Sequence, residues 1–327
     1  MSALPPPEGY DDCNEYTRII IDEALTRGIR VVVLDPDIGE MELTHDGRTH
    51  TVIQSLSELT SAVAFRRCDD KAMTRRVLTA ADLPVPPGRI ATDNEADEAF
   101  LAEHGSIVVK PCRGEGGAGI SVGVSDVDEL RSAIASARAA CDRVLLEAMA
   151  PGEDLRVLVI DGEVVAASVR RPPTVVGDGS STVRQLVEAR NEHRAAELGP
   201  NMVTPLDDIT ASSVRAACHT LDDVLDEGVA LEVRRTANLH TGGTIHDMTP
   251  CLHPTLAEAA IRAAAALDLP VAGIDLMVPS PEGPEHVCIE VNEQPGLANH
   301  EPQPTAPRYL DLLFPATTAP DAPPPRS

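Results

Sequence analysis

The glycine-rich segment at residues 114–119 most constrains the fold, because a strand pattern follows it rather than a helix pattern. Its spacing matches the GxGxxG sequence of dinucleotide-binding folds, which requires a helix to begin directly after the loop. Residues 120–124 instead alternate as a half-buried strand does, and the Lys-Ser/Thr ending of a P-loop is absent. The segment therefore predicts a hairpin whose glycine-rich turn can fold backbone N–H groups over phosphates. An ordinary flexible hairpin is the other interpretation.

Lysine is nearly absent from the chain. Of 27 basic residues, only Lys71 and Lys110 are lysines, and the others are arginines. A lysine ammonium is a compact charge on a flexible stem, which suits it to reach a phosphate as a point charge. Composition alone leaves the chance survival of two surface lysines open. However, Lys110 closes a predicted strand directly before the glycine-rich segment, which favours a phosphate site.

Two acidic positions in the C-terminal part of the chain form the strongest candidate site. Strand patterns flank a turn signal at 280–285, and an in-register hairpin centred on that turn places Asp275 opposite Glu290. Asn292 lies two residues further along on the same face, whereas Ile289 is expected on the apolar face. An oxygen-only set of this kind suits Mg²⁺ shared with substrate phosphates. A solvated strand edge and a glycosidase-type carboxylate pair are the alternatives.

The net charge and the cysteines narrow the class of protein. A formal net charge of −25 argues against a nucleic-acid groove or an anionic membrane surface as the main partner. The sequence contains no run of about 18 uncharged apolar residues, the length needed to span a membrane, and no basic, apolar signal segment follows Met1. The seven cysteines are scattered without metal-ligand spacing, which fits reduced thiols in a cytoplasm. We therefore expect a cytoplasmic protein that acts on small molecules.

The order of predicted elements favours an α+β protein with antiparallel sheets. Residues 14–70 predict a small α/β unit, and Ser125 with Asp128 predicts a capping box that opens a helix. The pattern is least readable at 198–228. The Pro-rich tail at 315–327 is expected to be disordered.

Taken together, these motifs resemble the ATP-grasp fold. They occur in that family's order: Lys71, Lys110-Pro111, residues 113–119, residues 147–156, Asp275 and Glu290-Val291-Asn292. The resemblance implies two α+β subdomains that grip ATP, with the glycine-rich lid in residues 67–150 and the metal ligands and substrate loop in residues 151–314. A short α/β domain at residues 1–66 is expected to precede them.

The resemblance also implies which residues hold ATP. It gives two lysines for the α- and β-phosphates, four lid residues, two residues at the adenine edge and one acid for the ribose: Lys71, Lys110, Gly114, Glu115, Gly116, Gly117, Glu147, Ala150 (through its backbone) and Asp154, with Glu153 as the alternative acid. Arg75, on the helix that follows Lys71, is expected to lie outside this set.

The metal, catalytic and substrate residues follow from the same resemblance. Two Mg²⁺ ions, with Mn²⁺ as an alternative, are expected on Asp275, Glu290 and Asn292. The implied catalytic residues are Arg156 and Arg235, on the transferring phosphate or acyl-phosphate oxygens, and Asn238. The implied substrate residues are Arg171, His240, Thr241, Gly242 and Gly243. His240 is a candidate base for the incoming ammonium group, with a plain polar contact as the other interpretation.

Further motifs resemble the cyanophycin-synthetase and glutathione-synthetase branch, and within it the ligase half of N-acetylglutaminylglutamine synthetase. They lie at residues 57–61, 67–71, 238–243 and 298–304. That family makes an osmoprotectant dipeptide by phosphorylating a carboxylate, joining it to an amine and releasing ADP and phosphate. The implied partners are a small acid and an amino acid.

That family commonly carries an acetyltransferase half before the ligase, and here only a short leader precedes the ligase motifs. The resemblance therefore leaves open a separate acetyltransferase that supplies an acetylated substrate, and also a homodimer. A ligase for other amino acids, a carboxylate kinase and a nucleotide-sensing module stay as alternatives.

Overall fold

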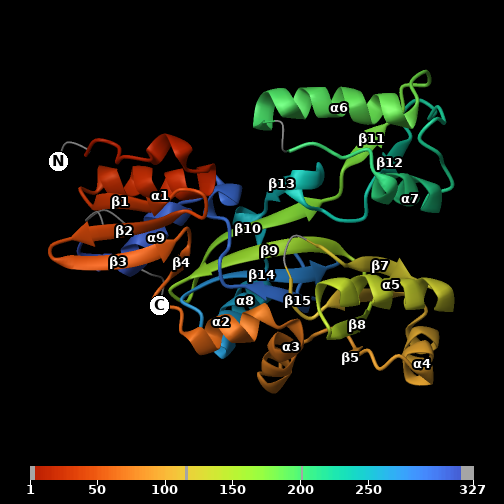
Figure 1. The fold of residues 1–327 in the computed structure, drawn as a ribbon, viewed down its shortest axis with the longest axis horizontal. Coiled ribbons are helices and arrows are strands. Elements are labelled where there is room, and N and C mark those ends of the chain that lie inside the picture. The colour runs from red at the N-terminus through yellow and green to blue at the C-terminus, as the bar shows by residue number, and fades with distance from the viewer. Residues whose placement is uncertain (1–3, 115–116, 200–201, 318–327) are drawn as a thin grey trace.

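The computed structural model of the chain describes residues 4–114, 117–199 and 202–317 (Figure 1). The helices are α1 (Glu15–Thr26), α2 (Ala62–Asp69), α3 (Lys71–Ala80), α4 (Glu95–His104), α5 (Val127–Ala140), α6 (Val183–Leu198), α7 (Asp208–Ala216), α8 (Pro254–Leu267) and α9 (Thr305–Leu313). The strands are β1 (Arg30–Asp35), β2 (Glu40–His45), β3 (Arg48–Ile53), β4 (Leu56–Ser57), β5 (Gly88–Ile90), β6 (Ile107–Pro111), β7 (Ser121–Val124), β8 (Val144–Ala148), β9 (Glu153–Ile160), β10 (Glu163–Arg171), β11 (Thr174–Val176), β12 (Ala230–Glu232), β13 (Thr244–Asp247), β14 (Val271–Val278) and β15 (Val287–Asn292).

These strands form separate antiparallel sheets. Their orders are β1-β2-β3-β4, β5-β8-β6-β7, β13-β10-β9-β14-β15 and the pair β11-β12. Every strand pairing recorded for the described residues is antiparallel, so the α+β expectation is confirmed.

The first part of the chain, which contains α1 and β1–β4 and is called the leading unit below, folds as its sequence predicts. Helix α9, near the C-terminus, packs against it. Asn14 caps α1 by accepting a hydrogen bond from the Thr17 N–H, and a tight turn joins β2 to β3. The buried side chains of α1 and β1–β3 share a core with Tyr309 and Leu310 of α9. The position at which this unit was expected to end, residue 66, falls inside α2. Of the tail at 315–327, only Pro315–Thr317 is described, as a short 3-10 turn, and the rest lies outside the described residues.

The sheet β5-β8-β6-β7 has one helix-covered face and one polar face. Val109 and Leu146 are buried in a core with α4 and α5. The alternate positions along β6 and β8, which include Lys110 and Glu147, therefore point to the other face. The predicted position of the N-cap of α5 is wrong by one residue. Asp126, rather than Ser125, accepts a hydrogen bond from the Glu129 N–H at 2.8 Å.

The five-stranded sheet has two different faces. One face is apolar throughout and packs on α8, α2 and α3. The other face is divided along the strands. Leu158, Ala166 and Val271 lie at one end, under α1 and α9, whereas the opposite end carries the charged residues described below. Figure 1 shows this sheet between the leading unit and the sheet that contains β7 and β8.

The helices α6 and α7 and the strands β11 and β12 lie together in a further part of the fold (Figure 1). A capping box of Thr182 and Gln185 begins α6. The segment at 198–228, which the sequence left unread, contains α7, and Val214 of α7 joins a small valine- and leucine-rich core with α6, β11 and β12. None of the described helices has the length and apolar character needed to cross a bilayer.

Candidate active site

The paired carboxylates predicted near the C-terminal end of the chain lie opposite each other. Asp275 of β14 pairs with Glu290 of β15, and Gly273 pairs with Asn292. Nearer the turn the prediction is wrong, because Leu276 pairs with Cys288. A β-bulge at this point moves Cys288 rather than Ile289 into the core, where Cys288 is 1% exposed. The pairing of the two carboxylates is thus confirmed on the side of the bulge away from the turn.

Two arginines hold the Asp275 carboxylate. Arg156 Nη2 donates to Asp275 Oδ2 at 2.9 Å, and Arg156 Nε also donates to this carboxylate. Arg170 Nη2 lies 3.1 Å from Asp275 Oδ1 and 2.7 Å from Asp154 Oδ1. Burial alone would raise the pKa of Asp275, but the two guanidinium groups outweigh burial and lower it to about 2. Asp275 is therefore an anion throughout the neutral range.

Arg170 is a site residue that the sequence analysis missed, and Arg171 was named in its place. Register explains the difference. The turn at Asp161 and Gly162 pairs Val164 with Val159, but a bulge then shifts the pairing so that Arg170 lies opposite Asp154. Without that bulge, Arg171 would share a face with Asp154. Arg171 instead lies 3.2 Å from Glu153 on the exposed side of the strand.

Lys71 connects the start of α3 to Glu290 of β15. Its Nζ lies 2.9 Å from Glu290 Oε1 and donates to the Gly114 carbonyl oxygen at 3.1 Å. Asn292 Nδ2 donates to the Gly273 carbonyl at 3.2 Å and lies 3.4 Å from Asp275 Oδ2. The fold thus brings both predicted carboxylates, the predicted amide and one predicted lysine together.

The oxygen atoms of this cluster fit a magnesium ion that is shared with phosphates. Within the described part of the chain, no three His, Cys, Asp or Glu side chains are grouped to hold a metal by themselves. Asp275 and Glu290 supply carboxylate oxygens from adjacent strands, and Asn292 adds an amide beside them. An ion on these residues would need further oxygen donors, which is how Mg²⁺ commonly binds with nucleotide phosphates.

The second lysine forms a buried pair with the predicted adenine residue. Lys110 Nζ contacts Glu147 Oε2, and both residues are buried. Arg75 Nη1 donates to the other oxygen of Glu147 at 2.8 Å. Arg75, which was expected to lie outside the nucleotide set, thus contacts one of its predicted members, because one turn of α3 carries it from Lys71 to Glu147.

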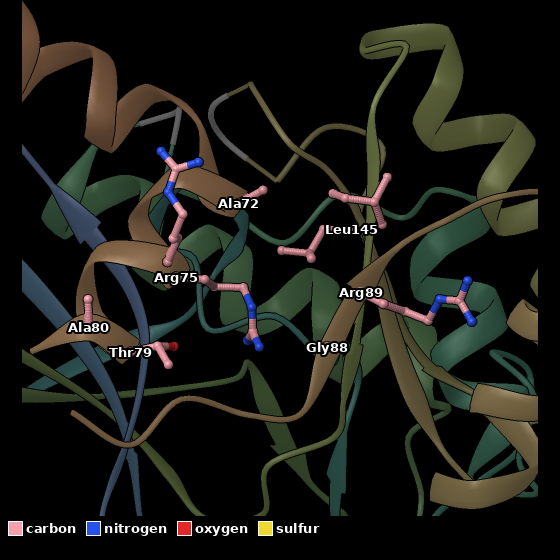
Figure 2. Close-up of a pocket in the computed structure, with 9 residues that line it drawn as sticks. Ala72, Arg75, Thr79, Ala80, Gly88, Arg89 and Leu145 are labelled. Atoms are coloured by element: carbon pink, nitrogen blue, oxygen red, sulfur yellow. The ribbon is translucent and has the colours of Figure 1, made fainter. Parts of the chain in front are cut away.

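A hollow of about 400 Å³ opens beside Arg75, between α3, β5 and β8 (Figure 2). Its lining residues are Ala72, Arg75, Arg76, Thr79, Ala80, Gly88, Arg89, Ile90 and Leu145. Figure 2 shows Arg75 reaching from α3 toward Gly88, whereas Arg89 points away from α3. A side chain at Gly88 would meet the Arg75 guanidinium and the Glu147 stem at about 3.0 and 3.1 Å, so glycine leaves room for their contact.

The remaining predicted nucleotide residues lie at the crossover from β8 to β9. Ala150 lies in this connection, which joins the two sheets. Gly152 passes so close to β14 that a Cβ there would lie 2.4 Å from the Val278 carbonyl oxygen. Asp154 follows on β9. Burial raises the pKa of Asp154, and Arg170 only partly offsets that rise. Its alternative, Glu153, bonds to Arg171.

Arg235 joins the lid hairpin to the α6 side of the site. Its Nη1 donates to the Val122 carbonyl oxygen of β7 at 2.8 Å, and a Cβ on Gly123 would collide with this guanidinium. Gly114 and Gly117 lie in the lid turn with φ of 127° and 81°, values that favour glycine. The predicted lid residues Glu115 and Gly116 lie outside the described residues.

The predicted substrate loop, residues 238–243, is hydrogen-bonded to side chains of α6. Asn238 begins a short 3-10 turn at Leu239–Thr241, where its side chain accepts from the His240 N–H at 2.9 Å, and the hydroxyl of Thr241 donates back to the Asn238 carbonyl. His240 is exposed.

Two arginines of α6 fix the end of this loop. Arg190 donates to the Gly242 carbonyl at 2.6 Å, and Arg194 donates to the Gly243 carbonyl at 3.0 Å. The loop therefore has a fixed backbone, which leads directly into β13.

His300, which the sequence analysis quoted only inside a motif, is buried at the charged end of the sheet. It closes the 3-10 turn Leu297–His300, and its Nδ1 lies 3.5 Å from Ser168 Oγ. Burial, followed by the positive charges of Arg156 and Arg170, lowers its pKa to about 4, although Asp247 and Asp275 act in the opposite direction. The ring is therefore uncharged at neutral pH.

We expect His300 to make the folded protein sensitive to acid. Its ordinary pKa of 6.5 falls to about 4 on folding, so the unfolded chain binds a proton more readily between these values. The stability due to the neutral ring is complete above pH 6.5 and is lost as the pH falls toward 4, by about 3 kcal/mol in all. Urea unfolding across this range should show a smaller loss for His300→Gln than for the unsubstituted chain. Equal losses would contradict the buried neutral state.

Comparison with protein families finds two matches. Residues 77–204 match the prokaryotic glutathione synthetase ATP-grasp domain, and residues 224–305 match the RimK-like ATP-grasp domain. The first match contains Lys110, Glu147 and Arg156, whereas the second contains Asp275 and Glu290.

Curated relatives match along nearly the whole chain. A cyanophycin synthetase of Geminocystis herdmanii is 34% identical over 316 residues, which are 91% of this chain and 36% of the relative. A glutathione biosynthesis bifunctional protein GshAB of Streptococcus thermophilus is 29% identical, over 95% of this chain and 44% of the relative. The chain thus spans less than half the length of these relatives.

Solved structures support the same fold. The bifunctional glutathione synthetase from Pasteurella multocida superposes with a TM-score of 0.66 at 23% identity, over 94% of this chain and 44% of that one. D-alanine–D-alanine ligase from Bacillus anthracis superposes with a TM-score of 0.50 at 16% identity, over 79% of this chain and 70% of that one.

Proposed function

The chain belongs to the ATP-grasp ligase family, and on that premise we propose that it joins a carboxylate to an amine at the cost of ATP. In this reaction the γ-phosphoryl group of ATP passes to the carboxylate, and the acyl phosphate formed is attacked by the amine. ADP and phosphate are released. A carboxylate and an amine alone form a salt rather than an amide, so the leaving oxygen has to be improved first.

The observation that carries the proposal is the charge arrangement around Asp275. Two partly buried arginines meet this carboxylate on one side, and Glu290 with Lys71 lies across the strand pair on the other. Phosphoryl transfer depends mainly on positioning and on cations that stabilise spreading negative charge. When bound, Mg²⁺ would neutralise phosphate oxygens and help to align the terminal phosphate.

The chain's own residues take roles that fit this reaction. Lys71 and Lys110 would exchange their carboxylate partners for nucleotide phosphates, since each already pairs with a carboxylate in a polar cluster. Arg156 would bind the transferring phosphate together with Arg170, which the sequence analysis did not name as a site residue. Arg235 would hold the lid hairpin against the α6 side while water is excluded. Asp275, Glu290 and Asn292 would bind the metal.

For the substrates, we propose an N-acetylated amino acid and an amino acid, as in N-acetylglutaminylglutamine synthesis. The motifs at 238–243 and 298–304 support this choice, because they border the site through the fixed substrate loop and His300. The proposal places the reaction in the cytoplasm, where the seven free cysteines would stay reduced.

The nucleotide product tests the proposed reaction. With N-acetylglutamine as the acid and glutamine or glutamine amide as the amine, we expect ADP and phosphate to form in equal amounts with the dipeptide. Hydroxylamine in place of the amine should give a hydroxamate and ADP. Chromatography of the nucleotides, beside assays that omit either the acid or the amine, measures both results across a panel of acids and amines.

Other outcomes of the same assay point to other functions. AMP as the stoichiometric product would overturn the acyl-phosphate route, whichever peptide is made, because an adenylate also yields hydroxamate. ADP formation that needs an acid but no amine would identify a carboxylate kinase. Nucleotide binding without turnover for the whole panel would favour a sensing module.

A further inference from the structure

One polar residue from each strand of the five-stranded sheet contributes to a continuous row. The row consists of Asp247 on β13, Ser168 on β10, Arg156 on β9, Asp275 on β14 and Glu290 on β15, each directly opposite the next. Figure 1 shows these strands side by side in this order. Directly opposed residues point to the same face of a sheet, so the side chains form one line across the site.

The proposed reaction assigns a direction to this row. Phosphate and metal belong at the end with Asp275 and Glu290, next to Arg156. The amine attacks the carbonyl carbon of the acyl phosphate from above or below the carbonyl plane, and it needs a position beside that carbon that the phosphate and the metal do not occupy. In the row, the part that they leave is Ser168 and then Asp247. Neighbouring strands are about 4.8 Å apart, so Asp247 lies roughly 10 Å from Arg156, with the buried Ser168 between them.

Asp247 differs from the other acids of the row in its partners. It is exposed, and both of its carboxylate oxygens accept hydrogen bonds from neutral groups. Oδ1 accepts from the Thr249 backbone N–H at 3.0 Å and from its hydroxyl at 2.6 Å, and Oδ2 accepts from the Gln303 amide at 2.9 Å. Among the described residues, no lysine or arginine forms an ion pair with it, whereas Asp275 pairs with Arg156 and Arg170, and Glu290 pairs with Lys71. Its negative charge is therefore open to a cation from solution.

His300 lies beside the middle of the row. Its Nδ1 is 3.5 Å from Ser168 Oγ, and Ser168 stands between Asp247 and Arg156 in the row. Since the ring is uncharged at neutral pH, it adds no positive charge that would repel an ammonium group. Within the described row, Asp247 is thus the carboxylate without an arginine or lysine partner, and a cationic group of a substrate could pair with it.

We propose that the amine substrate binds at this end of the row, with its ammonium group on Asp247 and beside Ser168 and His300. The ligand class is a small primary amine that is protonated at neutral pH, such as an amino acid. This inference rests on the proposed function and assigns a position to one of its two organic substrates.

The test replaces only the charge of Asp247. Asp247→Asn keeps an oxygen acceptor for the Thr249 N–H, so the local turn is preserved. With glutamine as the amine and N-acetylglutamine as the acid, we expect KM for glutamine to rise at least about tenfold. KM for ATP and for the acid should stay within about twofold. ADP formation driven by hydroxylamine, which is largely uncharged near neutral pH, should be unchanged. The matched control is Asp178→Asn, because Asp178 caps the Ser180 N–H in the same manner at 2.8 Å but lies outside the sheet.

The outcomes separate this inference from the proposed function. An unchanged KM for glutamine in Asp247→Asn, or an equal loss with glutamine and with hydroxylamine, would overturn the amine subsite while leaving the ligase reaction in place. If the unsubstituted protein forms no ADP with acid and hydroxylamine, the proposed function fails, and the subsite fails with it. Thermal unfolding of both variants should match that of the unsubstituted protein.

Discussion

Asp275→Asn is expected to lower turnover by at least about a hundredfold and to weaken Mg·ATP binding. The substitution removes the charge that would face the proposed metal, and an electrostatic contact at the reacting group is commonly worth that much in rate. It also leaves Arg156 and Arg170 without the carboxylate that both of them contact. Steady-state kinetics at limiting and saturating Mg²⁺ measures the loss of turnover and of Mg·ATP binding. Thermal unfolding measures the effect of leaving the two arginines without their carboxylate.

The metal role and the structural role of Asp275 can be separated by a second variant. Glu290→Gln removes the other proposed metal ligand, but Glu290 is partly exposed and pairs with Lys71 rather than with the arginines. It should therefore reduce activity strongly with little change in unfolding temperature. Asp268→Asn, in the left-handed turn after α8 where asparagine is tolerated, serves as the control. Near-normal turnover of Asp275→Asn at limiting Mg²⁺ would contradict the metal assignment.

Lys110→Met is expected to raise the dissociation constant for ATP by at least about tenfold, or about 1.4 kcal/mol. The substitution removes a charge-assisted phosphate contact and also leaves Glu147 with Arg75 as its remaining described ion-pair partner. Isothermal titration with Mg·ATP measures the affinity. ATP should also raise the unfolding temperature of the variant less than that of the unsubstituted protein, because stabilisation by a ligand follows its affinity.

The control for Lys110 must come from outside the cluster around Glu147. Arg75 is unsuitable because it contacts the same carboxylate. Arg131 on α5 is 66% exposed and forms a surface pair with Glu98, so Arg131→Met should change ATP affinity little. If Arg131→Met and Lys110→Met weaken ATP binding equally, the two lysines have no special role.

Local sequence signals determined the elements whose chemistry is local. The turn at Asp46 and Gly47 and the alternation after Gly119 each depend on residues within a few positions of one another. The same holds for the opposed pair Asp275 and Glu290, because one short turn joins their strands. For this reason the class of fold and the main carboxylate pair could be predicted without the structure.

The tertiary structure decided what depends on register and on distant packing. One bulge in β10 turned Arg170 rather than Arg171 toward Asp275, and another in β15 buried Cys288 in place of Ile289. A bulge exchanges the two faces of a strand for every residue beyond it, yet it leaves little trace in a period-2 pattern.

Packing between distant segments decided the rest of the site. Arg75 reaches Glu147 because α3 packs beside β8, and His300 reaches Ser168 because the 3-10 turn before α9 returns to the central sheet. Hydrophobic burial drives that packing, and it does not depend on the sequence distance between the residues that it brings together. The residue types at the site could therefore be named from the chain alone, whereas their partners, and with them the electrostatics of the site, required the folded structure.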